Sequence, residues 1–281
     1  MKGSAMSTAR GVALVRALEM QRPEAERISS DPYAARFADP LLLRLTRLTI
    51  ASGVSSLVGI EPMINFALLR ERYVDDIMRN ELTAGAGQIV VLGAGFDSRA
   101  YRLDRPDVVV FEVDHPDTQA DKRGALADVV VPFPATVCFV PVDFDIDDLD
   151  ERLTAAGYDP ARRTVFVWQG VIPYLTQTGV DHTLAVVARN THPQSLLVFD
   201  YGYVETKVRM SWFVRLYTGL VRERMLFGFP RGGLAAYLGP RGFDVVGNVE
   251  CAELRDRYVP AARRFPVTAG VAIATVRAHR Q

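Results

Sequence analysis

Two glycines and an aspartate within residues 88–114 are spaced like groups that hold an adenosine. The segment QIVVLGAGFDSR starts at Gln88 and places Gly93, Ala94 and Gly95 directly after an apolar run; a second run, VVVFEVD, ends on Asp114. Glycine lets the backbone pass close to a ligand where a Cβ would collide, and a carboxylate at a strand end can accept hydrogen bonds from both ribose hydroxyls. This spacing predicts an enzyme that uses a nucleotide cofactor.

The residues after the second glycine discriminate between two cofactors. A dinucleotide site favours Gly or Ala three positions after that glycine, where this chain has Ser98. A pyrophosphate there would also meet the carboxylate of Asp97 at the start of the next helix. S-adenosylmethionine has no phosphate and carries a cationic sulfonium and ammonium, so we predict this cofactor. A nicotinamide oxidoreductase and a non-catalytic cofactor-binding module are the alternatives.

The elements that must position these residues follow from hydrophobic periodicity. Residues 8–82 have helical periodicity and predict an N-terminal helical cap, with helix starts at Asp31-Pro32, Asp39-Pro40 and Glu61-Pro62. Apolar runs then alternate with helical or irregular segments, which predicts an α/β sheet core at about 88–200 and 240–281. The predicted strands are 88–93, 108–114, 137–142, 163–168 and 195–200, with 243–250 and 264–276 as an antiparallel hairpin at the sheet edge. The chain is read as a single domain, 1–281.

Two connecting segments have a predicted role. Residues 201–239 are rich in aromatic residues, Met and Arg, and such an insertion after a sheet strand is placed to cover the ligand crevice as a lid. The alternative is that this insertion only packs against the rest of the protein and has no role at the ligand crevice. The acidic run from Asp145 to Asp150 predicts a helix N-terminus that faces water.

Composition excludes several kinds of partner. The 281 residues carry 33 basic and 33 acidic side chains, so no global field favours nucleic acid or an anionic membrane. Cys138 and Cys251 stand alone and the four histidines are scattered, so no metal site is predicted. The N-terminus lacks the continuous apolar core of a signal peptide, and 41–60 is too interrupted by Arg and Gly to span a bilayer. A cytoplasmic enzyme with a small-molecule acceptor is predicted.

Seven motifs, in order, resemble the leucine carboxyl methyltransferase family. They are TARGVALVRALE, DPYAARF, RERYVDDIM, VVLGAGFDSRAYRL, FEVDHP, PVDF and VWQGVIPYLT, within about residues 8–200. The resemblance is closest to the bacterial branch of S-adenosylmethionine-dependent O-methyltransferases. It implies a class I methyltransferase fold: a seven-stranded, mostly parallel sheet with one antiparallel strand, an N-terminal helical cap and a later insertion.

The resemblance also implies roles for single residues. It assigns Gly93, Ala94 and Gly95 to the cofactor-binding turn, Asp114 to the ribose, and Asp143 with Phe144 to the adenine. His115 is expected to neighbour the adenosine. Each residue has a structural alternative: Asp143 could cap the helix beginning near residue 147, and Phe144 could belong to the core.

One arginine of RERYVDDIM is expected to bind the methionine carboxylate of the cofactor. Arg72 is assigned this role and Arg70 is its rival; on a helix the two point about 200° apart, so only one can face the pocket. Arg72 could instead form a solvated ion pair with Asp75 or Asp76.

The end of the fourth strand departs from the family pattern. Gln169 stands where the family has, as a rule, an acid, and it keeps the hydrogen bonds without the negative charge. Gln169 and Tyr174 are assigned as positioning residues of the catalytic site, and Gln169 also as a cofactor contact. Trp168 could stack on the cofactor or pack in the strand.

The expected chemistry is an in-line methyl transfer in a dry pocket. A carboxylate acceptor with a pKa near 4 is ionised at neutral pH and needs no base, which predicts a methyl ester of a small molecule, such as a secondary metabolite. A phenolic acceptor would need a base, for which His115 is the candidate. Candidate acceptor contacts are Arg16 and, in the insertion, Arg209, Trp212, Phe213, Arg215, Tyr217, Arg222, Arg224, Phe227 and Phe229.

Overall fold

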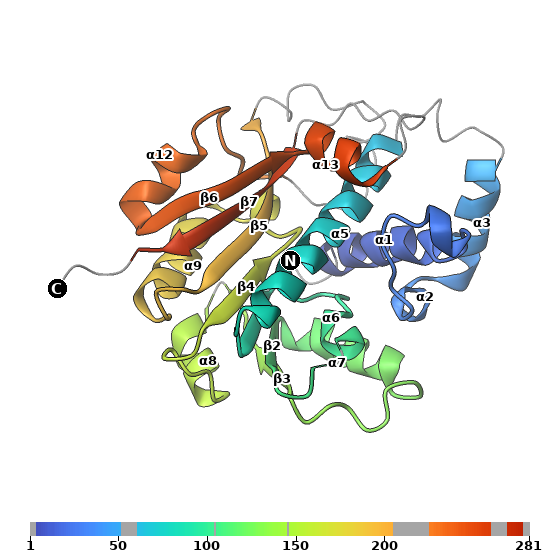
Figure 1. Cartoon of the computed structure of the whole chain (residues 1–281). Coiled ribbons are helices and arrows are strands. Elements are labelled where there is room, and N and C mark those ends of the chain that lie inside the picture. Colours follow the sequence, from blue (N-terminus) through green and yellow to red (C-terminus); the bar gives the residue numbers. More distant parts are fainter. Residues whose placement is uncertain are drawn as a thin grey trace.

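The computed structural model describes residues 4–51, 61–103, 105–144, 146–204, 225–259 and 269–277. Within these residues seven strands form one sheet (Figure 1). In spatial order they are β3 (Val137–Pro141), β2 (Val109–Asp114), β1 (Gln88–Leu92), β4 (Thr164–Trp168), β5 (Leu196–Gly202), β7 (Ala269–Val276) and β6 (Phe243–Glu250). The strand order reverses beside β1, so the crevice expected for a ligand lies at the carboxyl ends of β1 and β4.

Five neighbouring strands, β3 to β5, run parallel, and β7 is antiparallel to both β5 and β6. Every residue of β1 and β4 is buried, as expected for parallel strands covered on both faces. The predicted sheet with one antiparallel strand is therefore confirmed. The predicted edge hairpin is only partly right, because helix α13 (Cys251–Tyr258) connects β6 to β7 and β7 lies between β5 and β6.

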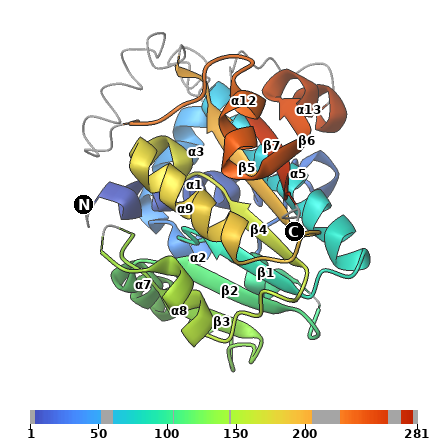
Figure 2. The ribbon, with the colours of Figure 1, turned by 90° about the vertical axis from the view of Figure 1, so that its left-hand side faces the viewer.

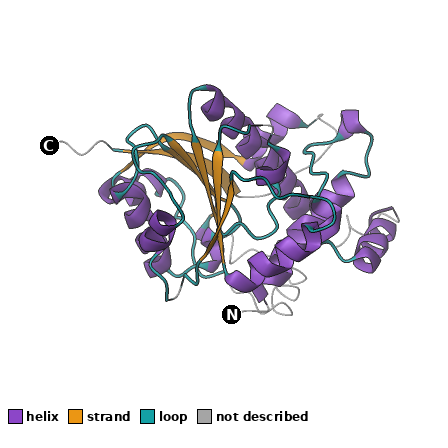
Figure 3. Cartoon of the chain, turned by 90° about the horizontal axis from the view of Figure 1, so that it is seen from below, coloured by secondary structure: helices purple, strands orange, loops and turns teal. Residues whose placement is uncertain are grey.

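Helices cover the two faces of the sheet (Figure 3). Ile89 and Val91 of β1 face α5 (Glu61–Thr83) and α13. Beside β2 the same face of the sheet is covered by α7 (Pro116–Leu126), where Lys122 Nζ lies 2.8 Å from Oε2 of Glu112. Val90 and Leu92 face the opposite core. That core includes side chains of α8 (Leu149–Ala155), α9 (Gln177–Arg189) and α12 (Leu234–Leu238). The alternation along β1 thus separates two apolar layers.

Of the N-terminal helices, α1 (Ser4–Glu19) lies beside α5, and α2 (Ala34–Phe37) and α3 (Pro40–Ala51) pack against α1 farther from the sheet (Figures 1 and 2). The short η1 (Glu24–Glu26) follows α1. The ring of Phe37 stacks on Phe96, just beyond the glycines, at 5.0 Å between centroids. The remaining short elements are α6 (Arg99–Arg102), η2 (Ile172–Tyr174) and η3 (Gly239–Arg241).

Two of the three predicted helix starts are confirmed. α3 begins at Pro40, with Asp39 Oδ1 accepting the amide of Leu42 at 2.8 Å, and α5 begins at Glu61. The start at Asp31-Pro32 is wrong, because Asp31 accepts the amide of Tyr33 in a turn and α2 begins only at Ala34. In the acidic run, Asp148 caps α8 by accepting two backbone amides, so the predicted helix N-terminus is confirmed.

Most of the predicted lid lies outside the described residues, including Arg209, Trp212, Phe213, Arg215, Tyr217, Arg222 and Arg224. Of its described part, Phe229 is fully buried, and the rings of Phe227 and Tyr237 contact it edge to face. These rings pack in the core beside β5 rather than lining a crevice. None of the described helices combines the length and the hydropathy that a bilayer span requires, and the described residues contain no group of three or more His, Cys, Asp or Glu side chains that could hold a metal ion.

Candidate active site

The turn after β1 adopts a backbone that favours glycine. Gly93 has φ +68° and Gly95 has φ +43°, both in the left-handed region. A Cβ on Gly93 would lie 2.4 Å from Cγ2 of Val171, and one on Gly95 would lie 3.4 Å from Cβ of Ala9 in α1. The turn is thus enclosed between the loop after β4 and the cap helix.

Replacing Gly93 by alanine is expected to lower the melting temperature by on the order of 5–10 °C. The substitution adds left-handed strain of about 1–2 kcal/mol and a clash with Val171, and about 2–4 °C is lost per kcal/mol in a protein of this size. Gly85→Ala is the matched control, because Gly85 has φ +96° but nothing within 4 Å of the added Cβ. Equal melting temperatures for the two variants would contradict the proposed clash.

Asp114 ends β2 beside this turn, and its carboxylate is oriented by the backbone. Oδ2 accepts the amide of Gly95 at 2.6 Å and Oδ1 accepts the amide of His115 at 2.6 Å. Burial raises the pKa of Asp114, against the opposing effect of these two hydrogen bonds. The side chain of Thr118 also hydrogen-bonds this carboxylate, so the hydroxyls of a ribose would use the remaining acceptor capacity or replace that hydrogen bond.

The residues expected around the adenine lie together near the ends of β2 and β3. His115 Nε2 lies 3.8 Å from Oδ2 of Asp143, and His115 Nδ1 accepts the amide of Asp117 and so caps α7. Asp143 does not cap α8; its amide donates to Asp147 Oδ2 at 2.8 Å. Phe144 is half-buried against the adjacent core.

The two arginines of α5 point in different directions, and only Arg70 faces the sheet end. Arg70 is buried and ion-paired through Nη1 with Asp200 of β5, while its Nε is buried without a partner among the described residues. Arg72 is 44 % exposed, pairs with Asp76 and lies over the ring of Tyr258 in α13. The solvated ion pair that was the alternative for Arg72 is therefore present, and the inward position belongs to its rival.

The turn after β4 is held by Asp200 and by α5. The amide of Gly170 donates to Asp200 Oδ1 at 2.5 Å, and a Cβ on Gly170 would lie 3.1 Å from Nη2 of Arg70. Gln169, just before, contacts Arg99 and Glu71 through its amide. Tyr174 ends η2 and is half-buried. Trp168 is 1 % exposed within the core, so it packs in the strand and is not placed for stacking on a cofactor.

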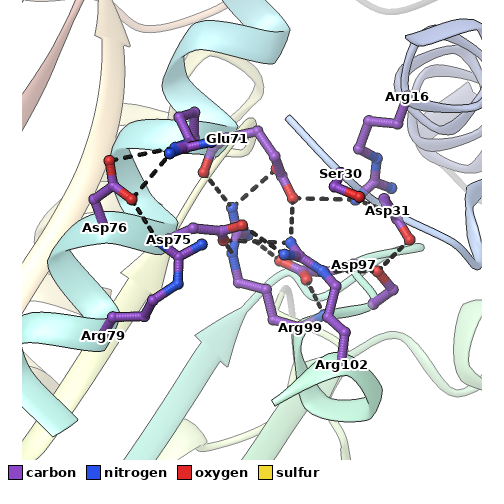
Figure 4. A network of polar contacts seen from close by, with 12 residues as sticks. Arg16, Ser30, Asp31, Glu71, Asp75, Asp76, Arg79, Asp97, Arg99 and Arg102 are labelled. Carbon is purple, nitrogen blue, oxygen red and sulfur yellow. Dashed lines mark hydrogen bonds and ion pairs between the residues drawn. The ribbon is translucent and has the colours of Figure 1, made fainter. Parts of the chain in front are cut away.

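A buried ionic network joins the cap, α5 and the glycine turn (Figure 4). Its members are Arg16, Asp31, Glu71, Asp75, Asp97, Arg99 and Arg102, three guanidinium groups and four carboxylates, with one negative charge in excess. Arg16 also donates to the carbonyl of Phe96 at 2.7 Å. Arg16 is thus engaged by Asp31, Glu71 and this carbonyl, while its Nε, like that of Arg70, has no partner among the described residues. The network fixes the cap on the glycine turn.

Glu71 lies at the centre of this network. Its burial alone would raise the pKa, but the charges of Arg99, Arg16 and Arg102 outweigh that effect and lower the pKa of Glu71 well below its ordinary value. A carboxylate whose pKa is depressed by folding stabilises the protein above its unfolded pKa, and this stabilisation is lost as pH falls towards the folded pKa.

Glu71→Gln is therefore expected to lower the melting temperature by on the order of 5–10 °C at pH 7, because it breaks a buried ion pair. The difference from the native protein should shrink as the pH falls below about 5, where the unfolded glutamate takes up its proton. Thermal melts between pH 3 and pH 7 measure this. A difference that is constant over that range would show that the charge of Glu71 does not stabilise the fold.

These residues fit S-adenosylmethionine. The half-buried Asp114 carboxylate matches the ribose hydroxyls, and the Nε of Arg70, which has no partner among the described residues, matches a carboxylate. The excess negative charge of the network suits a cationic ammonium and sulfonium. A bound cofactor would supply an activated methyl group, while Gly93, Asp114 and Arg70 would hold and orient it.

The fold and this site define a class I methyltransferase. The leucine carboxyl methyltransferase family profile matches residues 9–188, more than half of the chain. The protein belongs to this family and is an S-adenosylmethionine-dependent methyltransferase.

Two relatives identified by sequence agree with this assignment. The chain is 31 % identical over 276 residues to a Frankia alni protein provisionally named an S-adenosyl-L-methionine-dependent methyltransferase, covering 92 % of this chain and 94 % of that protein. A similarly named protein of Mycobacterium tuberculosis H37Rv is 34 % identical over 260 residues, covering 85 % and 73 %. Among solved structures, the magnesium protoporphyrin IX methyltransferase of Synechocystis PCC 6803 with bound S-adenosylhomocysteine gives a TM-score of 0.48 at 13 % identity, covering 76 % and 86 %.

Sequence reasoning did not assign Glu71, Arg99 or Asp200. Asp200 had a usable signal, because it closes an apolar run as Asp114 does. Glu71 and Arg99 had none, because they contact each other and Gln169 across elements distant in the sequence.

Proposed function

We propose that the enzyme transfers the methyl group to a carboxylate oxygen of a small molecule and forms a methyl ester. The observation that carries this proposal is the absence, in the described part of the site, of a group suited to act as a general base. Asp114 and Asp200 contact the two turns directly, but Asp114 is assigned to the ribose and Asp200 is held by Arg70 and the amide of Gly170. Glu71 and Asp97 also lie beside the end of β4 and the glycine turn. Although burial opposes it, neighbouring guanidinium groups lower the pKa of both, so they are weak bases.

His115 does not supply the missing base. Its Nδ1 accepts a backbone hydrogen bond at the start of α7, and its Nε2 faces Asp143 on the side expected for adenine. A phenol with a pKa near 10 would need such a base to react at neutral pH, whereas a carboxylic acid is already ionised. The site therefore supports a carboxylate acceptor over a phenolic one.

The test uses cofactor with a labelled methyl group and a panel of aliphatic and aromatic acids and phenols. A methyl ester releases labelled methanol in mild alkali, whereas an aryl methyl ether does not. We expect turnover with one or more acids and alkali-labile label in the product. Label that resists alkali would contradict carboxylate methylation, and product formed only with phenols would support the alternative.

A further inference from the structure

The side chain of Gln169 lies between a hydrogen-bond donor, the guanidinium of Arg99, and a hydrogen-bond acceptor, the carboxylate of Glu71. Its Oε1 accepts a hydrogen bond from Nη2 of Arg99 at 2.9 Å, and its Nε2 donates to Oε2 of Glu71 at 3.0 Å. A neutral amide satisfies both, because it carries an acceptor and a donor on one planar group. A carboxylate at residue 169 would instead place two carboxylate oxygens about 3 Å apart, where they repel unless one of them takes up a proton.

The charged groups around residue 169 favour an amide over a carboxylate at this position. The network already holds more carboxylates than guanidinium groups, and Glu71 and Arg99 are almost fully buried. A further carboxylate would add uncompensated charge where water does not screen it. The amide thus adds hydrogen bonds without adding charge.

Helix α5 also holds the residue that follows Gln169. Glu71 binds the side chain of Gln169, and the preceding helix residue, Arg70, lies against Gly170. Gly170 and Arg70 share the carboxylate of Asp200. Two consecutive residues of α5, Arg70 and Glu71, therefore contact two consecutive residues of the turn, Gly170 and Gln169. A displacement of residue 169 would shift Gly170 relative to Arg70.

We propose that Gln169 is a positioning residue whose amide holds the turn after β4 against α5. Because Gly170 of this turn and Arg70 of α5 share the carboxylate of Asp200, this contact sets the orientation in which Arg70 meets the carboxylate end of the cofactor. This role differs from direct contact with the methyl donor. It rests on the assignment of Arg70 to the cofactor and is independent of the acceptor's identity, so failure of the proposed methyl-ester reaction would leave it standing.

The test is a charge exchange between residues 71 and 169. Binding of S-adenosylhomocysteine and of 5′-methylthioadenosine, which lacks the amino-acid end, is measured by calorimetry at pH 8 for the native protein, Gln169→Glu, and Glu71→Gln/Gln169→Glu. We expect Gln169→Glu to weaken S-adenosylhomocysteine binding by at least tenfold and methylthioadenosine binding by less than threefold. The double variant, which again pairs one amide with one carboxylate, should bind S-adenosylhomocysteine within about fivefold of the native protein.

Gln88→Glu is the matched control. Gln88 is also buried and hydrogen-bonded, but it lies at the start of β1, at the opposite end of the strand from the glycine turn, so binding should not change. Native-like binding by Gln169→Glu, equal weakening of both ligands, or a double variant no better than the single one would each overturn the proposal. If Gln169→Glu does not fold, a folded double variant that binds within fivefold supports it, and a double variant that also fails to fold overturns it.

Discussion

Asp114→Ala is expected to weaken S-adenosylhomocysteine binding by at least 100-fold. The carboxylate is held by the amides of Gly95 and His115, and the side chain of Thr118 also hydrogen-bonds it. Two charge-assisted hydrogen bonds to ribose hydroxyls contribute about 1.5–3 kcal/mol each, and their joint loss gives a change of two orders of magnitude or more.

The loss should be separable from unfolding. Burial raises the pKa of Asp114, so removing its charge relieves a desolvation cost that offsets the two lost backbone hydrogen bonds. We therefore expect a melting temperature within a few degrees of the native protein. Asp107→Ala, at an exposed loop residue, is the control and should bind normally. Affinity within threefold of native in Asp114→Ala would remove this residue from the ribose.

Arg70→Met is the second variant with a large expected effect. Arg70 is the arginine of α5 that faces the sheet end with a free donor, so its removal should weaken S-adenosylhomocysteine binding by about 100-fold. Binding of 5′-methylthioadenosine, which has no methionine carboxylate, should change by less than threefold. The ratio of the two affinities reports on the amino-acid end of the ligand, even though Asp200 loses its partner and stability falls.

Arg72→Met is the matched control on the same helix. Its guanidinium lies at the surface beside Asp76 and Tyr258, so both ligands should bind as to the native protein. If Arg72→Met lost affinity for S-adenosylhomocysteine and Arg70→Met did not, the first assignment of Arg72 to the cofactor would be restored. Weakening of both ligands by Arg70→Met would point to general distortion of the site.

These two arginines illustrate what a sequence leaves open. The pattern RERYVDD established that at most one of the two arginines faces the pocket, because helical geometry turns residues two apart to different sides. Which one faces inward depends on where α13 packs, and Tyr258 of that helix covers Arg72. The local sequence around Arg72 carries no information about its contact with Tyr258, because the two residues lie far apart along the chain.

The sequence by itself determined the seven strands, the glycine turn and Asp114, because alternation, glycine and a strand-ending acid act within a few residues or between neighbouring strands. It also determined the family. The tertiary structure alone decided that Arg70 pairs with Asp200, 130 residues away, and that Gln169 donates to Glu71, 98 residues away. Such pairs form only when packing removes water from between them, since buried charges and amides must find their partners inside the protein.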